Sequence, residues 1–178
     1  MLAQEVGVSE RTLRRAVNQG AIRAIRPTPR TLKISLSERA YIRRSWTLLF
    51  ALRAALRTER NVRFAALYGS AARGTDTQAS DVDIAIDLRD PSLDRVVDLS
   101  TKLSDIIGRP VDLVRLHDVQ ADPPLLADLI SHGRVLVDRD GVWPRLRRRE
   151  SSLRHRWRWE ESERARTALA GIDRLLES

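Results

Sequence analysis

The chain has 178 residues, of which 42% are hydrophobic and 31% are charged, and it contains no cysteine. This composition is typical of a folded globular protein, and the absence of cysteine excludes disulfide bonds and thiolate metal sites. No apolar run is long enough to span a bilayer and no signal peptide is recognisable, so we expect a cytoplasmic protein without a membrane partner.

The net charge of +8 is unevenly distributed along the chain. Residues 1–60 contain 13 Lys and Arg against 4 Asp and Glu, whereas residues 61–140 contain 9 against 14. Residues 141–178 are basic again, with 10 against 6. A basic front favours contact with phosphate backbones, and an acidic centre in a chain with three histidines favours a hard cation held by carboxylates. The arginines near the C-terminus are equally compatible with ordinary solvated helices.

The first twenty residues have the pattern of two short helices joined by a turn. Gly7 interrupts the first helix, Ser9 is a good N-cap for a second helix over residues 10–19, and Gly20 ends it. Three cations occupy the outer face of the second helix: Arg11, Arg14 and Arg15. The segment resembles a helix-turn-helix, and we expect these side chains to contact DNA. The alternative is a plain helical hairpin that packs on the next domain.

Residues 21–35 alternate loosely between aliphatic and basic side chains around Pro27 and Pro29. This pattern predicts a β-hairpin wing with prolines at its tip. The cations that we expect to reach DNA from the wing are Arg23, Arg26, Arg30 and Lys33. The first helix lacks its usual first turn, from which we hypothesise that the natural start lies upstream of Met1.

A long helix is expected from Ser35 to about Arg57. Ser35 and Glu38 have the spacing of a capping box, in which each side chain bonds to the backbone of the other residue. The apolar side of this helix comprises Leu36, Ala40, Tyr41, Trp46, Leu48, Leu49, Leu52 and Leu56. We interpret the helix as a rigid connection between two modules, and its aromatic residues as core rather than a ligand site.

Residues 62–68 form an apolar run of strand length that ends in Gly69 and Ser70, followed by a short helical stretch with Arg73. A strand that runs into Gly-Ser and a short helix leaves backbone N–H groups pointing outward, where anionic phosphate is favoured. Taken alone, such a pair is as compatible with an ordinary turn.

The segment Asp81-Val-Asp-Ile-Ala-Ile-Asp87 has the periodicity of a strand. Side chains alternate along a strand, so Asp81, Asp83 and Asp87 share one face with Ala85. Two neighbouring carboxylates repel each other unless a cation lies between them. Mg²⁺ suits Asp81 and Asp83, because it binds a few carboxylates and completes its shell with water and triphosphate oxygens.

A helix around residues 93–107 precedes another short strand, residues 111–114, in which Asp112 is the only acid. If this strand lies beside the first acidic strand, three carboxylates converge on one point. Otherwise Asp112 pairs with Arg109 or Arg115, because a carboxylate among aliphatic residues is costly without a partner.

The stretch GSAARGTDTQASDVDIAI, which begins at Gly69, resembles the signature of the DNA polymerase β-like nucleotidyltransferases. It is still more similar to the minimal nucleotidyltransferases that are paired, as antitoxins, with HEPN ribonuclease toxins. The similarity extends from about Val62 to Val137 and includes the strand around Asp112 and the segment LLADLISHGRVL.

This resemblance implies in-line attack on the α-phosphorus of ATP, with pyrophosphate leaving and two Mg²⁺ ions stabilising the attacking and departing oxygens. The residues that it implies as catalytic metal ligands are Asp81, Asp83 and Asp112. Asp112 would also help to activate the attacking hydroxyl. The residues implied to bind the triphosphate are Gly69, Ser70 and Arg73.

The remaining chain predicts a short helix after Pro123 and Pro124, a final strand at residues 135–137 and a turn at residues 138–141. A basic C-terminal helix is expected to begin near Trp143. We expect this helix to pack on the chain or to form a homodimer contact.

The sequence therefore predicts an α+β protein with four parts. These are a winged helix-turn-helix (1–35), a connecting helix (36–60), a small mixed-sheet nucleotidyltransferase domain (61–140) and a basic C-terminal helical segment (141–178). The expected function is Mg²⁺-dependent transfer of AMP from ATP to a HEPN-type toxin, by an antitoxin whose N-terminal module binds DNA. Two alternatives stay open: a DNA-binding regulator with a non-catalytic nucleotide-sensing domain, and nucleotide transfer to tRNA.

Overall fold

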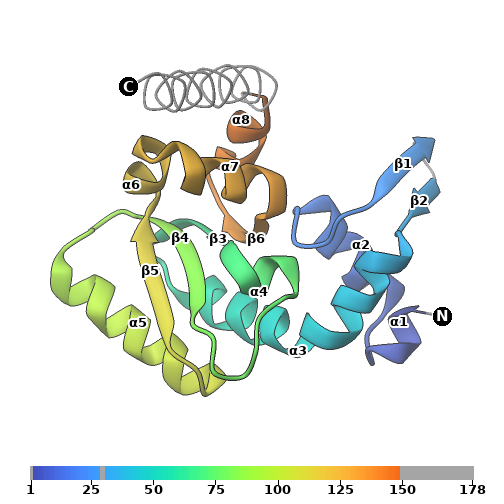
Figure 1. Cartoon of the computed structure of the whole chain (residues 1–178), viewed down its shortest axis with the longest axis horizontal. Helices are drawn as coiled ribbons and strands as arrows, with labels where there is room; N and C mark the ends of the chain where they lie inside the picture. The colour runs from blue at the N-terminus through green and yellow to red at the C-terminus, as the bar shows by residue number, and fades with distance from the viewer. Residues whose placement is uncertain (1, 29–30, 149–178) are drawn as a thin grey trace, which may run out of the picture. The chain divides into compact units, whose positions relative to one another are not determined.

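A computed structural model of the chain describes residues 2–28 and 31–148 (Figure 1). Most of the predicted C-terminal helix and Arg30 of the predicted wing lie outside the described residues. The chain divides into two units after Trp143, and Met1–Trp143 is the first of them. The N-terminal elements therefore belong to the same compact unit as the central sheet. Within the described ranges, no helix is both long enough and apolar enough to cross a bilayer.

Helices and strands alternate irregularly along the chain, as expected for an α+β protein. Their order is α1 (Leu2–Glu5), α2 (Glu10–Asn18), β1 (Ile25–Thr28), β2 (Thr31–Lys33), α3 (Leu36–Thr58), β3 (Val62–Leu67), α4 (Gly69–Arg73), β4 (Val82–Leu88), α5 (Leu93–Ile107), β5 (Val111–Arg115), α6 (Leu116–Ala121), α7 (Pro123–His132), β6 (Arg134–Asp138) and α8 (Val142–Arg148).

The central sheet has the strand order β5-β4-β3-β6. Strand β3 pairs antiparallel with both β4 and β6, whereas β4 and β5 are parallel. The sheet is therefore mixed, as predicted. Helices α3 and α5 pack against each other and against the sheet (Figure 1), and the side chains of β3 and β4 that face them, such as Val62 and Ile84, are fully buried.

The N-terminal elements form two short helices and a hairpin. Gly7 has a φ of 68°, a left-handed conformation that favours glycine and ends α1. The Ser9 side chain accepts a hydrogen bond from Thr12 N and caps α2, as predicted. Strands β1 and β2 pair antiparallel, so the hairpin is present where the wing was expected.

Helix α3 was expected to bury Leu36 and Ala40, and this prediction is wrong. Both residues are exposed, and Leu36 is 84% accessible. The buried side of the helix instead runs through Glu38 and Tyr41 to Leu56. The local pattern misled because the first turn of α3 buries a charged residue whose partner lies far away in sequence.

That partner is Arg134 at the start of β6, and the pair corrects the predicted capping box. The Ser35 hydroxyl does accept a hydrogen bond from Glu38 N, but the Glu38 carboxylate does not return to the Ser35 backbone. It accepts bonds from Arg134 Nη1 at 2.5 Å and from Arg23 N at 2.9 Å. The Arg134 guanidinium also lies over the ring of Tyr41, 3.2 Å from its centroid.

Candidate active site

The candidate site lies at the edge of the sheet where β3 ends and β4 and β5 begin. Strand β3 turns directly into α4, and the Tyr68 N–H donates to the carbonyl of Asp83 at 3.0 Å. In the parallel pairing of β4 with β5, Asp83 is opposite Asp112. The topology thus brings together the Gly-Ser turn and two acids that are far apart in sequence, as predicted.

Gly69 and Asp83 are in close contact. A Cβ atom on Gly69 would lie 2.2 Å from Asp83 Oδ2, and the φ of Gly69 is 67°. Both the space and the backbone conformation therefore require glycine at this position. The carboxylate of Asp83 faces the beginning of α4, where the sequence predicts the triphosphate.

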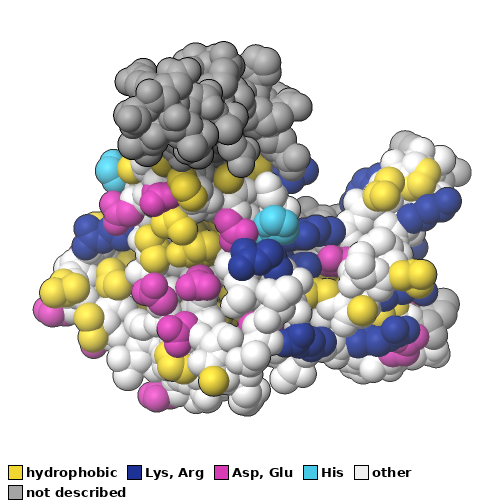
Figure 2. All heavy atoms as spheres, viewed as in Figure 1, with side chains coloured by type: hydrophobic (Ala, Val, Ile, Leu, Met, Phe, Trp, Pro, Cys, Tyr) yellow, Lys and Arg dark blue, Asp and Glu magenta, His cyan; other side chains and the backbone are white. Residues whose placement is uncertain are grey.

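Negative charge accumulates around Asp83. Burial raises the pKa of its carboxyl, and the neighbouring charges of Asp112, Asp81 and Asp128 raise it further. Burial, followed by the charges of Asp83, Asp112, Asp128 and Asp122, raises the pKa of the Tyr68 hydroxyl to about 12. Figure 2 shows acidic side chains gathered on the viewed face over the region of β4 and β5. The charge of Arg73 opposes the rise in the pKa of Asp83 in part, and the remaining excess of negative charge favours a bound cation.

The predicted metal ligands are carboxylates, the donors that a divalent cation prefers, but they are not drawn together around one point. Within residues 2–28 and 31–148, no group of three or more acidic or histidine side chains is close enough to hold a metal ion. Asp83 and Asp112 are nevertheless paired in register. In the described residues, Asp112 forms no ion pair with Arg109 or Arg115. Arg109 pairs with Asp76, and Arg115 donates to the Pro91 carbonyl.

Asp128 of α7 is the site residue that sequence reasoning missed. Its Oδ2 accepts a hydrogen bond from Gly69 N at 2.8 Å, and its Oδ1 accepts from Arg73 Nη1 at 2.5 Å. His132, one turn later, lies 3.0 Å away through Nδ1. Despite burial, these bonds lower the pKa of the Asp128 carboxyl. The i, i+4 spacing of Asp128 and His132 was the only signal in the sequence, and it is a common one on helix surfaces.

Asp128 therefore accepts hydrogen bonds from two of the three residues that the sequence predicts to bind the triphosphate, through the Gly69 amide and the Arg73 guanidinium. Ser70, the third predicted residue, follows Gly69 in the first turn of α4. The two donors are already oriented toward an anion, and in this structure the anion is a side chain of the same protein.

The family of the chain can be read from its similarity to known proteins. Residues 51–141 match the model of the family "Polymerase beta, Nucleotidyltransferase". The chain belongs to this nucleotidyltransferase family. Two provisionally named protein adenylyltransferases of Methanocaldococcus jannaschii are each 35% identical to it over 79 residues, which cover 42% of this chain and 81% of each relative.

Solved structures share the fold of this nucleotidyltransferase. A crystal structure of a toxin-antitoxin with AMP-PNP aligns with a TM-score of 0.51 and 21% identity, over 70% of this chain and 98% of that chain. A tri-AMPylated HEPN toxin of Shewanella oneidensis in complex with its MNT antitoxin aligns at 0.44 and 19% identity, over 72% and 95%. The first likeness confirms the fold, and the second is too weak to add to it.

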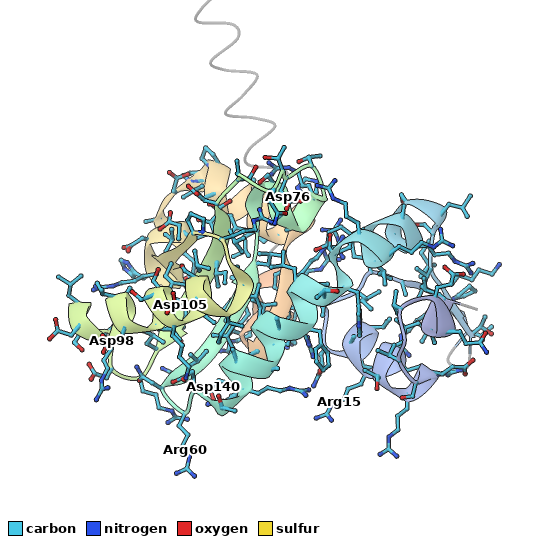
Figure 3. All side chains as sticks on the ribbon, turned by 90° about the horizontal axis from the view of Figure 1, so that it is seen from below. Arg15, Arg60, Asp76, Asp98, Asp105 and Asp140 are labelled. Atoms are coloured by element: carbon cyan, nitrogen blue, oxygen red, sulfur yellow. The ribbon has the colours of Figure 1, made fainter. Side chains whose placement is uncertain are left out.

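The loop that leads to Asp81 in the nucleotidyltransferase is held by two arginines, Arg109 and Arg44. Arg109 donates to Asp76 Oδ2 at 2.8 Å and to the Ser80 carbonyl at 2.7 Å. Arg44 of α3 donates to the Gly74 carbonyl at 2.7 Å. Asp76, which Figure 3 labels, is 8% exposed. These contacts fix the chain between α4 and β4 and so position Asp81 at the mouth of the site.

The cations predicted to bind DNA fall into two groups. Basic side chains gather around the N-terminal elements in Figure 2, and those that are exposed are Arg11, Arg14, Arg15, Arg26 and Lys33. Arg23 differs, because its guanidinium donates to the carbonyl of His132 and its N–H donates to Glu38. Its contacts therefore assign Arg23 to packing against α7 rather than to DNA.

Proposed function

We propose that this nucleotidyltransferase transfers AMP from ATP to a hydroxyl group of a partner protein, a toxin of the HEPN type. The observation that carries the proposal is the juxtaposition of Asp83, Asp112 and Gly69 at one edge of the sheet. Two similarities support it: the archaeal relatives are named as protein adenylyltransferases, and the toxin-antitoxin of like fold was crystallised with AMP-PNP, an ATP analogue.

The site residues have separate tasks in this reaction. The Gly69 amide, the Ser70 hydroxyl and the Arg73 guanidinium bind the triphosphate and hold the α-phosphorus in line with the acceptor hydroxyl. Asp81, Asp83 and Asp112 would hold Mg²⁺, which when bound neutralises charge on the phosphates and lowers the pKa of the acceptor hydroxyl. A bond forms between the acceptor oxygen and the α-phosphorus, and the bond to the β-phosphate oxygen breaks. Asp112 takes the proton, and pyrophosphate leaves.

We further propose that α2 and the hairpin bind duplex DNA through exposed cations. Arg14 of α2 and Lys33 of β2 are both exposed, and the Arg26 guanidinium donates to Asn18 Oδ1, which ties the hairpin to the end of α2. Helix α2 would enter the major groove while the hairpin contacts the flanking backbone, as in other winged helix-turn-helix modules.

The proposal is tested by mixing the purified chain with Mg²⁺, labelled ATP and the protein of the neighbouring reading frame, with tRNA in a parallel reaction. We expect the protein to be labelled by the wild type and not by the variant Asp81→Asn/Asp83→Asn. Asp87→Asn is the matched control, because Asp87 lies on the same strand but pairs with Arg63. If only tRNA is labelled, the acceptor is RNA and not a protein. No label on either, with DNA binding retained, would favour a non-catalytic regulator.

A further inference from the structure

A cavity of about 310 Å³ lies between α2 and α3 and shares no residue with the candidate active site. Four guanidinium groups and two aromatic rings dominate its wall: Arg11, Arg15, Arg53, Arg57, Trp46 and Phe50. The cations of α2 are four residues apart, and the four side chains of α3 follow one stripe of that helix. Figure 3 labels Arg15 where the two helices adjoin.

Positive charge in this cavity is not balanced by the protein. No Asp or Glu lines the cavity, and none of its four arginines forms an ion pair in the part of the chain that the structure describes. Burial, followed by the like charges of Arg57 and Arg15, lowers the pKa of Arg53 to about 10. Cations held together without a counter-charge favour an anionic ligand.

The cavity is built before any ligand arrives. The guanidinium of Arg53 donates to the Val135 carbonyl at 2.7 Å and to Gln19 Oε1, so its position is fixed by the sheet and by the end of α2. Arg11, Arg15 and Arg57 are exposed at the rim, where their long side chains can close on a phosphate group.

The aromatic wall distinguishes this cavity from a bare anion site. The aromatic residues of α3 were expected to lie in the core, but Phe50 is 55% exposed, which corrects that prediction. Its ring lies 6.4 Å from that of Trp46, tilted by 31°. Aromatic faces beside arginines are the means by which proteins bind unpaired bases, since every base can stack on them while its phosphates meet the cations. The volume is at the small end for ligand pockets and suits one nucleotide.

We propose that the cavity between α2 and α3 binds an unpaired nucleotide, with its phosphate on the four arginines and its base against Phe50 and Trp46. The nucleotide is either free or part of a single-stranded nucleic acid. This site is separate from the triphosphate site at Gly69. It overlaps the proposed duplex-binding surface only at Arg11 and Arg15, and Arg14 belongs to that surface alone.

The test uses the full chain, in EDTA so that nucleotidyl transfer cannot occur, and a fluorescein-labelled oligouridylate of about twelve nucleotides, within the range of strand-binding sites. Fluorescence anisotropy gives the dissociation constant. We expect Phe50→Ala to weaken binding by about fivefold or more, the loss expected for one stacked base. Arg11→Gln/Arg57→Gln should weaken it further and reduce its salt dependence. Arg89→Gln, an exposed cation beyond the end of β4 and outside both the cavity and the duplex-binding surface, should leave it unchanged.

Competition identifies the source of the nucleotide. Displacement of the oligonucleotide by AMP, but not by inorganic phosphate, assigns a free-nucleotide site, and failure of AMP to displace it assigns a strand site. The proposal is overturned if the wild type does not bind the single strand or if Phe50→Ala binds like the wild type. It is also overturned if inorganic phosphate and AMP both displace the oligonucleotide, at similar concentrations. All three variants replace exposed side chains, so folding is expected to be retained. Because binding is measured without nucleotidyl transfer, a negative result in the transfer assay would not change the outcome of this binding test.

Discussion

The carboxylate of Asp128 accepts a hydrogen bond from the backbone N–H of Gly69 at 2.8 Å, in the place where a triphosphate oxygen is expected. The same carboxylate pairs with Arg73. An internal anion thus competes with the nucleotide for its own binding groups.

This competition makes Asp128→Asn a variant with a gain of affinity. The amide keeps the shape of the side chain but removes the negative charge that attracts Arg73 and repels phosphate. Because exposed ion pairs contribute up to about 1 kcal/mol, we expect the dissociation constant of ATP to fall roughly three- to fivefold. Isothermal titration calorimetry measures it. Asp140→Asn, which removes a similar ion pair with Arg63, is the control. Weaker binding in Asp128→Asn would mean that Asp128 positions the donors instead of blocking them.

Asp83 should reduce the stability of the metal-free protein. Burial and the adjacent acids raise its pKa in the folded state. Folding therefore favours the protonated form, and this contribution to stability is present at low pH and is lost as the pH rises through the raised pKa. At neutral pH without metal, we expect Asp83→Asn to raise the melting temperature by roughly 1–4 °C.

The same melting temperatures are then measured with added Mg²⁺. Excess Mg²⁺ should raise the melting temperature of the wild type, because it binds only the folded state, and should have little effect on Asp83→Asn. The same shift by Mg²⁺ in both proteins would place the cation elsewhere.

Substitution in the buried pair of Glu38 and Arg134 should lower the free energy of unfolding strongly. Arg134 is 2% exposed, and it also donates to the Ala72 carbonyl at 2.7 Å. Glu38→Gln leaves a buried guanidinium without its counter-charge, so we expect a loss of about 3–5 kcal/mol in the free energy of unfolding. Urea denaturation checks this value. Arg43→Gln, which breaks the exposed pair with Glu5, should cost less than about 1 kcal/mol; equal losses in the two variants would contradict the account.

DNA binding by the N-terminal elements is predicted to depend on exposed cations. Arg14→Gln and Lys33→Gln should each weaken binding to duplex DNA and reduce the magnitude of the salt slope by about one, the change expected for one lost phosphate contact. Gel shifts at several salt concentrations measure both quantities. Arg89→Gln, which replaces an exposed cation beyond the end of β4, serves as control. If the salt slope is the same in the wild type and in all three variants, Arg14 and Lys33 do not contact DNA.

Local signals predicted most of the fold. Gly108 ends α5 in a left-handed conformation, and Ser9 caps α2. These residues act on their own neighbours, so sequence shows their effect directly. The proximity of Asp83 and Asp112 was also predictable. Side chains alternate along β4, and the spacing of the Gly-Ser pair and the two aspartates resembles that of one family.

Contacts between distant segments were not predictable. Glu38 has the spacing of a capping box, but its charge is satisfied by Arg134, 96 residues away. Asp128 looks like an ordinary helix-surface acid until the fold brings α7 against α4. Helix α6 was not predicted, because the six residues Leu116–Ala121 are too few to show a helical period.

The most direct measurement of the central claim compares ATP labelled at the α-phosphate with ATP labelled at the γ-phosphate, in reactions with the partner protein and Mg²⁺. If Asp81, Asp83 and Asp112 direct attack on the α-phosphorus, the α-label appears on the acceptor and the γ-label leaves as pyrophosphate. Asp112→Asn should abolish the transfer. Incorporation of the γ-label, or full transfer by Asp112→Asn, would contradict the account.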